Sequence, residues 1–150
     1  GYPHDLVVAV QATNGLSTAN TENRVKALET FSGKPEFNSV VATYKRVVNL
    51  LKESELGTTE IVASLFEHPS ESALYESVIN ISSQVAGAVS RETFPEAILA
   101  LLAMKPATDD FFENVMVNAD NQAVRANRLQ LCRSVRDAYR LVADFSLVQQ

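Results

Sequence analysis

Apolar residues recur with the period of an α-helix along most of this chain, and this feature constrains the fold more than any other. The clearest run lies between residues 36 and 52, where successive apolar residues are separated by 3, 1, 3, 3, 1 and 3 positions. Its members are Phe37, Val40, Val41, Tyr44, Val47, Val48 and Leu51. This spacing places one apolar stripe along one face of a helix. Since no convincing run of alternating apolar and polar residues occurs, the sequence predicts an all-α fold.

Turn and cap residues predict where the other helices begin and end. We expect helices at about 5–13, 21–32, 61–66, 70–89 and 94–105, with breaks at Asn14-Gly15, Gly33, Gly57-Thr58-Thr59 and His68-Pro69. Thr21 or Asn20 is expected to cap the second of these helices. Thr93 and Glu96 have the spacing of a capping box at the start of the helix over 94–105.

Two more helices are expected in the last third of the chain. One begins at Thr108 or Asp109 and includes the segment FFENVMV. The last and longest runs from about residue 121 to about residue 142, with Asp120 as its cap. Seven or eight helices joined by short turns predict a single helical bundle over residues 1–150.

The composition excludes several classes of protein. Apolar residues make up 46% of the chain, and only five glycines and five prolines occur, so a sizeable core is expected rather than disorder. Cys132 is the only cysteine, which rules out a disulfide within the chain and fits a reducing compartment. No apolar run approaches the length of a membrane span, and no signal-peptide pattern opens the chain. We therefore expect a cytoplasmic protein without membrane contacts.

The residue patterns of catalytic and metal sites are missing from the sequence. His4 and His68 are far apart and neither lies in an HExxH or HxH setting, and Cys132 has no partners at zinc-ligand spacing. Neither a glycine-rich phosphate loop nor a GxSxG segment occurs. Asp109 and Asp110 are better explained as residues of a helix start than as an acid–base pair. The sequence predicts no catalytic residue, no metal and no cofactor in this chain.

Arginine is concentrated near the end of an otherwise acidic chain. Residues 121–150 carry five Arg and two Asp, whereas residues 1–120 carry 8 Lys and Arg against 16 Asp and Glu. The net charge of −5 argues against broad, non-specific binding of nucleic acid. On a helical wheel, one side of the last helix holds the apolar residues and another holds Arg125, Arg128, Arg133, Arg136 and Arg140.

Two interpretations of this arginine face remain open. In the first, the arginines pair with carboxylates of neighbouring helices, and Arg128 is the strongest candidate because Asp109 and Asp110 open the preceding helix. In the second, the face binds phosphate, because the planar guanidinium group matches phosphate oxygens and also stacks on bases. Lys45 and Arg46 form a second basic point along the chain.

Four segments of the chain, in order, carry a family resemblance. They are YPHDLVVAV, KPEFNSVVATYKRVVNLLK, LFEHPSESALYE and PATDDFFENVMVNADNQAVRANRLQLCRSVRDAYRLVADFSLVQQ. Together they resemble the C-terminal region of the bacterial glycyl-tRNA synthetase β subunit, a helical anticodon-binding domain of the DALR type that is similar to the one in arginyl-tRNA synthetase. The sequence departs from the family pattern at Asn118, where an apolar residue is usual. Cys132 and Phe145 stand where aliphatic residues are more frequent.

The resemblance implies a division of labour within a larger enzyme. This chain would be one domain of a longer β chain and would hold the anticodon loop of glycine tRNA. The α subunit would carry the site for ATP, Mg²⁺ and glycine, and two α and two β chains would assemble. The implied partners are therefore glycine tRNA, the α subunit and the rest of the β chain, with no DNA and no membrane.

Side-chain chemistry nominates the residues that would contact RNA. Arg125, Arg133, Arg136 and Arg140 are expected to bind phosphates or stack on bases, and Lys45 and Arg46 to bind a second phosphate. Asn49 and Asn127 are candidates for reading base edges. Phe111 and Phe112 are expected in the core, because Val115 and Met116 continue their stripe. The alternative is a protein-interaction domain whose arginine face docks an acidic partner or another region of its own enzyme; exposed rather than paired arginines would favour RNA.

Overall fold

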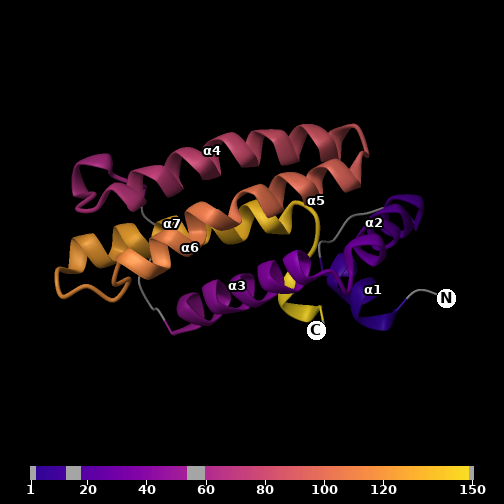
Figure 1. Ribbon diagram of the computed structural model, residues 1–150, viewed down its shortest axis with the longest axis horizontal. Coiled ribbons are helices and arrows are strands. Elements are labelled where there is room, and N and C mark those ends of the chain that lie inside the picture. Colours follow the sequence, from indigo (N-terminus) through magenta and orange to yellow (C-terminus); the bar gives the residue numbers. More distant parts are fainter. Residues whose placement is uncertain (1–2, 13–17, 54–59, 149–150) are drawn as a thin grey trace.

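Helices account for nearly all the regular structure in this computed structural model, which describes residues 3–12, 18–53 and 60–148 (Figure 1). Seven α-helices and two 3-10 helices occur in these ranges, without any strand, so the predicted all-α class is confirmed. In chain order they are α1 His4–Gln11, α2 Thr18–Phe31, α3 Pro35–Lys52, η1 Ala63–Leu65, α4 Pro69–Ser90, α5 Phe94–Ala103, α6 Lys105–Asn114, α7 Gln122–Arg140 and η2 Phe145–Leu147.

The long helices lie side by side, and α7 packs between two of them. Helices α4 and α5 form a hairpin along one edge, and α6 continues roughly in line with α5 (Figure 1). Helix α7 packs against α4 on one flank and against α3 on the other. Helices α1 and α2 gather at one end of the molecule together with η2. Residues from α3, α4 and α7 therefore meet around one central helix.

Aromatic side chains set the relative direction of α3 and α7. The rings of Tyr44 and Tyr139 lie 5.2 Å apart, and Phe145 packs against both at 6.0 and 5.3 Å. Phe37, near the start of α3, lies 6.0 Å from Phe145, just beyond the end of α7. The start of α3 thus faces the end of α7, so the two helices run antiparallel. Such offset and edge-to-face pairs add to the stability supplied by burial.

The segment after α7 is held by polar contacts with the first two helices. Nη1 of Arg24 in α2 donates hydrogen bonds to the carbonyl oxygens of Leu141 and Val142, at 2.7 and 2.8 Å. Leu141 is the C-cap of α7 and Val142 follows it, so their carbonyls have no partner further along the helix. The Asp144 N–H donates to the Ala9 carbonyl of α1 at 2.9 Å. The chain beyond α7 therefore closes the bundle against α1 and α2.

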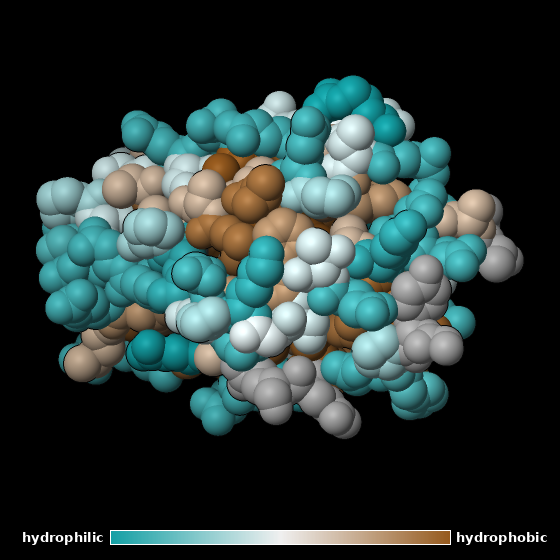
Figure 2. Space-filling model, turned by 45° about the vertical axis from the view of Figure 1, so that its right-hand side comes forward, coloured by the Kyte–Doolittle hydropathy of each residue, from teal (hydrophilic) through white to brown (hydrophobic). Residues whose placement is uncertain are grey.

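Most large apolar side chains are buried, and the surface is largely hydrophilic on the face shown in Figure 2, with an apolar area near its centre. Phe111 is fully buried, which confirms its predicted place in the core. Met116 instead is 74% exposed, because α6 ends at Asn114 and does not continue through the predicted FFENVMV segment. Helix α6 also begins earlier than predicted, at Lys105, directly after α5.

Several predicted helix ends need correction. Helix α2 begins at Thr18, before the predicted caps Asn20 and Thr21, whereas Gly33 ends it as predicted, with a positive φ of 88° that suits glycine. Thr93 is the N-cap of α5 as predicted, but its side chain makes no capping hydrogen bond; its hydroxyl lies 3.1 Å from the Ala88 carbonyl oxygen and 3.0 Å from a Glu96 carboxylate oxygen. The predicted turns at 14–15 and 57–59 lie outside the described residues.

Two caps lie where the sequence analysis did not place them. A capping box forms at the start of α4, where His68 Nδ1 accepts the Ser70 N–H and the Glu71 carboxylate accepts the His68 N–H at 2.9 Å. At the start of α7, the cap is Asn121 rather than Asp120, since its Oδ1 accepts the Val124 N–H at 3.1 Å.

Candidate nucleic-acid interface

Basic side chains from α3 and α7 meet along the line where these two helices pack. Burial raises the pKa of the Cys132 thiol to about 12, and the nearby guanidinium charges of Arg133 and Arg46 oppose that rise. Arg46 of α3 and Arg133 of α7 are therefore both close enough to the Cys132 thiol for their charges to act on it. We define the basic face as the predicted contact residues on this seam: Lys45, Arg46, Asn49, Arg133, Arg136 and Arg140.

Arg136 and Arg140 extend the basic face toward the end of α7. Burial raises the pKa of the Tyr44 hydroxyl to about 12, the Asp144 charge adds to the rise, and Arg140 and Arg136 oppose it. Both guanidinium groups are thus close to Tyr44, which is itself fully buried as part of the core. The tyrosine ring consequently supports the basic face from beneath and is not itself available for stacking.

The arginines at this end of the basic face make only weak internal ion pairs. Arg136 donates to Oδ1 of its neighbour Asp137 at 3.1 and 3.0 Å, and the Asp137 side chain is 64% exposed. Arg140 lies 4.0 Å from a carboxylate oxygen of Asp144. Each pair has one largely exposed partner, Asp137 at 64% or Arg140 at 47%, and surface pairs contribute roughly 0–1 kcal/mol, so a phosphate can replace the carboxylate at little cost. Both Arg136 and Arg140 can therefore still bind a phosphate despite their internal ion pairs.

Three other predicted contact residues lie on or near the same seam. Asn49 is exposed, Lys45 is half-buried, and both belong to the same turns of α3 as Arg46. Arg133 is half-buried and its Nη1 donates to Gln130 Oε1 at 3.2 Å.

Arg125 lies eight residues before Arg133, which is about 12 Å along the helix axis. Because α3 and α7 are antiparallel, this offset carries Arg125 toward the end of α3, away from the basic face.

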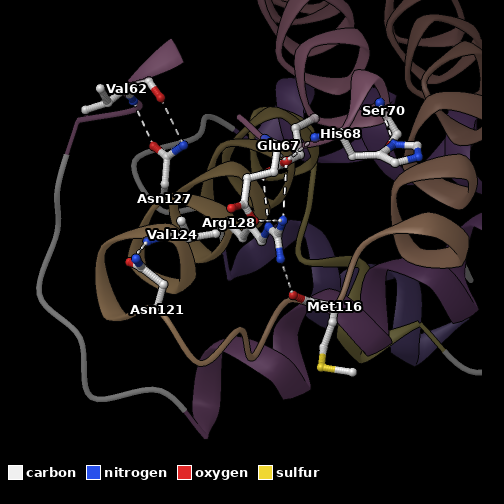
Figure 3. Close-up of polar contacts among 10 residues, drawn as sticks. Val62, Glu67, His68, Ser70, Met116, Asn121, Val124, Asn127 and Arg128 are labelled. Carbon is white, nitrogen blue, oxygen red and sulfur yellow. Dashed lines mark hydrogen bonds and ion pairs between the residues drawn. The ribbon is translucent and has the colours of Figure 1, made fainter. Parts of the chain in front are cut away.

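Asn127 has a structural role instead of the predicted contact with RNA. The residue is only 2% exposed. Oδ1 accepts the N–H of Val62 at 2.7 Å and Nδ2 donates to the Val62 carbonyl at 3.1 Å (Figure 3). These two bonds tie the segment before η1 to α7. The amide is committed to the main chain, so we remove Asn127 from the proposed interface.

Arg128 makes the internal ion pair that the sequence suggested, but with other partners. Its Nε donates to Glu71 Oε1 at 3.0 Å, Nη2 to Glu67 Oε1 at 3.1 Å and Nη1 to the Met116 carbonyl at 2.8 Å (Figure 3). The predicted partners are engaged elsewhere: Asp109 pairs with Lys105, and Asp110 accepts from Asn114. Arg128 thus faces the start of α4, and the segment after α6 contributes the Met116 carbonyl to the same site.

Glu71 is the buried end of this network and was missed at the level of sequence. Burial, the largest influence, would raise the pKa of its carboxyl group, but hydrogen bonds from Arg128 and from the N–H groups of Glu67 and His68 outweigh it and lower the pKa. The carboxylate is therefore ionised at neutral pH. One signal was available, since Glu71 stands three residues after His68, the spacing of a capping box.

Phe112 was expected in the core, and the structure places it at the edge of the core beside Arg46. It is half-buried rather than fully in the core, and Cζ of Arg46 lies 4.4 Å from the centroid of its ring. The two residues are 66 positions apart, so no local pattern could have brought them together.

Within the residues that the structure describes, no group of three His, Cys, Asp or Glu side chains is placed to hold a metal ion. Likewise, none of the described helices is both long and apolar enough to cross a membrane.

The whole basic face lies within the range matched by a known family. The model of the DALR anticodon binding domain matches residues 40–142, more than half of the chain. The chain belongs to this family. In this DALR domain the match begins inside α3 and ends just after α7, so α1 and α2 precede it.

The DALR domain is also similar to part of longer proteins. It is 34% identical over 148 residues to the glycine–tRNA ligase beta subunit of Syntrophus aciditrophicus, covering 99% of this chain and 21% of the relative. It is 35% identical over 150 residues to that of Edwardsiella ictaluri, covering 99% and 22%. For Neisseria meningitidis serogroup C the identity is 34%, covering 98% and 21%. The chain thus spans about a fifth of the length of the curated relatives it matches.

Proposed function

We propose that this DALR domain binds the anticodon loop of glycine tRNA, as one domain of a longer chain of the glycine–tRNA ligase β type. One observation carries the proposal: the basic face, whose residues are exposed or half-buried on a molecule with net charge −5, lies wholly within the matched range of an anticodon-binding family. A local cationic surface on an acidic body suits recognition of a few phosphates and bases, not general attraction to nucleic acid.

The proposed division of labour places catalysis outside this chain. An α subunit would supply the ATP, Mg²⁺ and glycine site, and the assembly would contain two chains of each kind in the cytoplasm. The similarity to glycine–tRNA ligase beta subunits supports this assignment. In this arrangement the DALR domain would position the tRNA while other parts of the enzyme share the affinity.

A binding measurement tests the proposal directly. Fluorescence anisotropy would report binding of the chain to a labelled glycine anticodon stem-loop and to a matched stem-loop with altered anticodon bases. We expect tighter binding to the glycine loop and a marked loss of affinity as salt is raised. Each contacted phosphate contributes about 0.7 to the slope of log K against log salt for single strands.

Matched variants locate the interface. Arg136→Ala and Arg140→Ala should each weaken binding and reduce the salt slope by about one unit or slightly less. Arg91→Ala is the control, because Arg91 is an exposed arginine paired with Glu96 at the α4–α5 turn, away from the basic face. Equal affinity for both stem-loops, or equal effects of all three substitutions, would contradict the proposal and favour docking of an acidic protein partner.

A further inference from the structure

The contact between Arg46 and Phe112 forms a flat feature on the basic face. Cζ of Arg46 in α3 lies over the Phe112 ring of α6, 4.4 Å from its centroid, well within the range of a cation–π contact. The Phe112 ring packs edge-to-face against Phe111 at 5.5 Å, and Phe111 is fully buried. The ring beneath Arg46 is thus anchored in the core. The contact with this ring restricts the motion of the Arg46 guanidinium group more than the motion of an ordinary surface arginine is restricted.

Arg46 also keeps access to solvent. The side chain is exposed, and among the described residues it makes no ion pair with a carboxylate, although the chain has more acidic than basic residues. An arginine held against a ring by one face offers its opposite face to a second planar group. A nucleobase is such a group, since RNA-binding proteins stack unpaired bases on guanidinium planes.

We propose that Arg46 and Phe112 form a stacking platform for one unpaired base of the bound RNA loop, which refines the proposed function and rests on it. The neighbouring side chains complete the site. Asn49 lies one turn further along α3, exposed, where its amide can meet the edge of the stacked base. The charges of Arg133 and Arg46 both act on the Cys132 thiol, and Arg133 supplies charge for the adjoining phosphate. The role of Arg46 therefore changes from phosphate binding to base stacking.

The substitution Arg46→Lys separates these two roles, because it keeps the charge and removes the planar group. If Arg46 stacks on a base, the variant binds the glycine stem-loop about 10-fold more weakly. The salt slope stays at the wild-type value, because the number of neutralised phosphates is unchanged. Phe112→Leu removes the support beneath Arg46 and should weaken binding similarly. Thermal unfolding of each variant, followed by circular dichroism, checks that the fold is retained; Arg46 is exposed, so Arg46→Lys should unfold like the wild type.

A set of stem-loops with one abasic position each identifies the stacked base. The wild type should lose about 10-fold in affinity at one loop position. For Arg46→Lys, removing the same base should lower the affinity hardly at all, because the contact between the base and the guanidinium group is already lost in this variant. A 2-aminopurine base at the same position should be quenched on binding to the wild type and much less on binding to the variant.

The possible failures are distinguishable. The stacking platform would be overturned if Arg46→Lys bound the glycine stem-loop as tightly as the wild type does. It would also be overturned if each abasic position lowered the affinity of both proteins equally. In either case, a wild-type preference for the glycine stem-loop would still uphold the proposed function. If the wild type shows no such preference, the proposed function fails and the platform fails with it.

Discussion

Removing the Arg128 guanidinium group should destabilise the protein strongly, because it breaks a buried ion pair. We consider Arg128→Met, which keeps a long side chain and deletes the charge. The Glu71 side chain, 0% exposed, then loses Arg128, the cation with which it pairs among the described residues. The Met116 carbonyl also loses the hydrogen bond that holds the turn between α6 and α7.

The expected cost follows from the asymmetry of buried ion pairs. Breaking such a pair by removing one partner costs about 3–5 kcal/mol, because the other charge stays buried and uncompensated. Two N–H groups still bond to Glu71, those of Glu67 and His68 at 2.7 and 2.9 Å, so we expect the lower half of that range. Glu67→Ala is the matched control and should cost no more than about 1 kcal/mol, because the Glu67 side chain is 64% exposed and Arg128 keeps its pair with Glu71.

Urea unfolding between pH 7 and pH 4 measures the loss of unfolding free energy and its dependence on pH. In the wild type the pKa of Glu71 is lowered, so its contribution is present above the usual pKa of 4.5 and is lost as pH falls through the lowered value. Without Arg128, burial becomes the dominant influence and raises the pKa of Glu71. Protonation then relieves the buried charge. The difference in unfolding free energy between variant and wild type should therefore shrink as the pH falls.

A double-mutant cycle completes the test. The double variant Glu71→Gln with Arg128→Met should lose less unfolding free energy than the two single variants together, because the double variant contains no unpaired buried charge. A cost below about 1 kcal/mol for Arg128→Met, a cost independent of pH, or strict additivity would each refute the reasoning.

Three further predictions follow from the described contacts. Asn127→Ala removes both bonds to Val62 and should cost about 1–3 kcal/mol and hasten proteolysis near residues 60–65, without changing affinity for the stem-loop; a large loss of affinity with an intact fold would restore Asn127 to the interface. Tyr139→Phe should leave the unfolding free energy unchanged or raise it by up to about 1 kcal/mol in urea titrations, because its buried hydroxyl has no hydrogen-bond partner among the described residues; a clear loss would show a missed partner. The Cys132 thiol, buried and with its pKa raised to about 12, should react with iodoacetamide at pH 8 only as fast as the protein opens, whereas labelling at the rate of a free thiol would contradict its burial.

Local patterns explain why the helices could be predicted. The apolar stripe from Phe37 to Leu51 has the period of a helix whatever it packs against, and α3 occupies those residues. Gly33 and His68-Pro69 end or begin helices through their own backbone restrictions. The caps were less predictable, because Asp120 and Asn121 are both good caps and only the exact start of α7 selects one.

The candidate site was predictable only in part, because a helical wheel groups residues without saying what faces them. The sequence by itself determined the helical class, the concentration of arginine in the last helix and the family pattern. The tertiary structure alone decided that Arg128 meets Glu71, that Asn127 binds the Val62 main chain and that Arg46 lies on Phe112. Each of these pairs joins residues more than fifty positions apart, and such contacts depend on how whole helices pack, which no local period encodes.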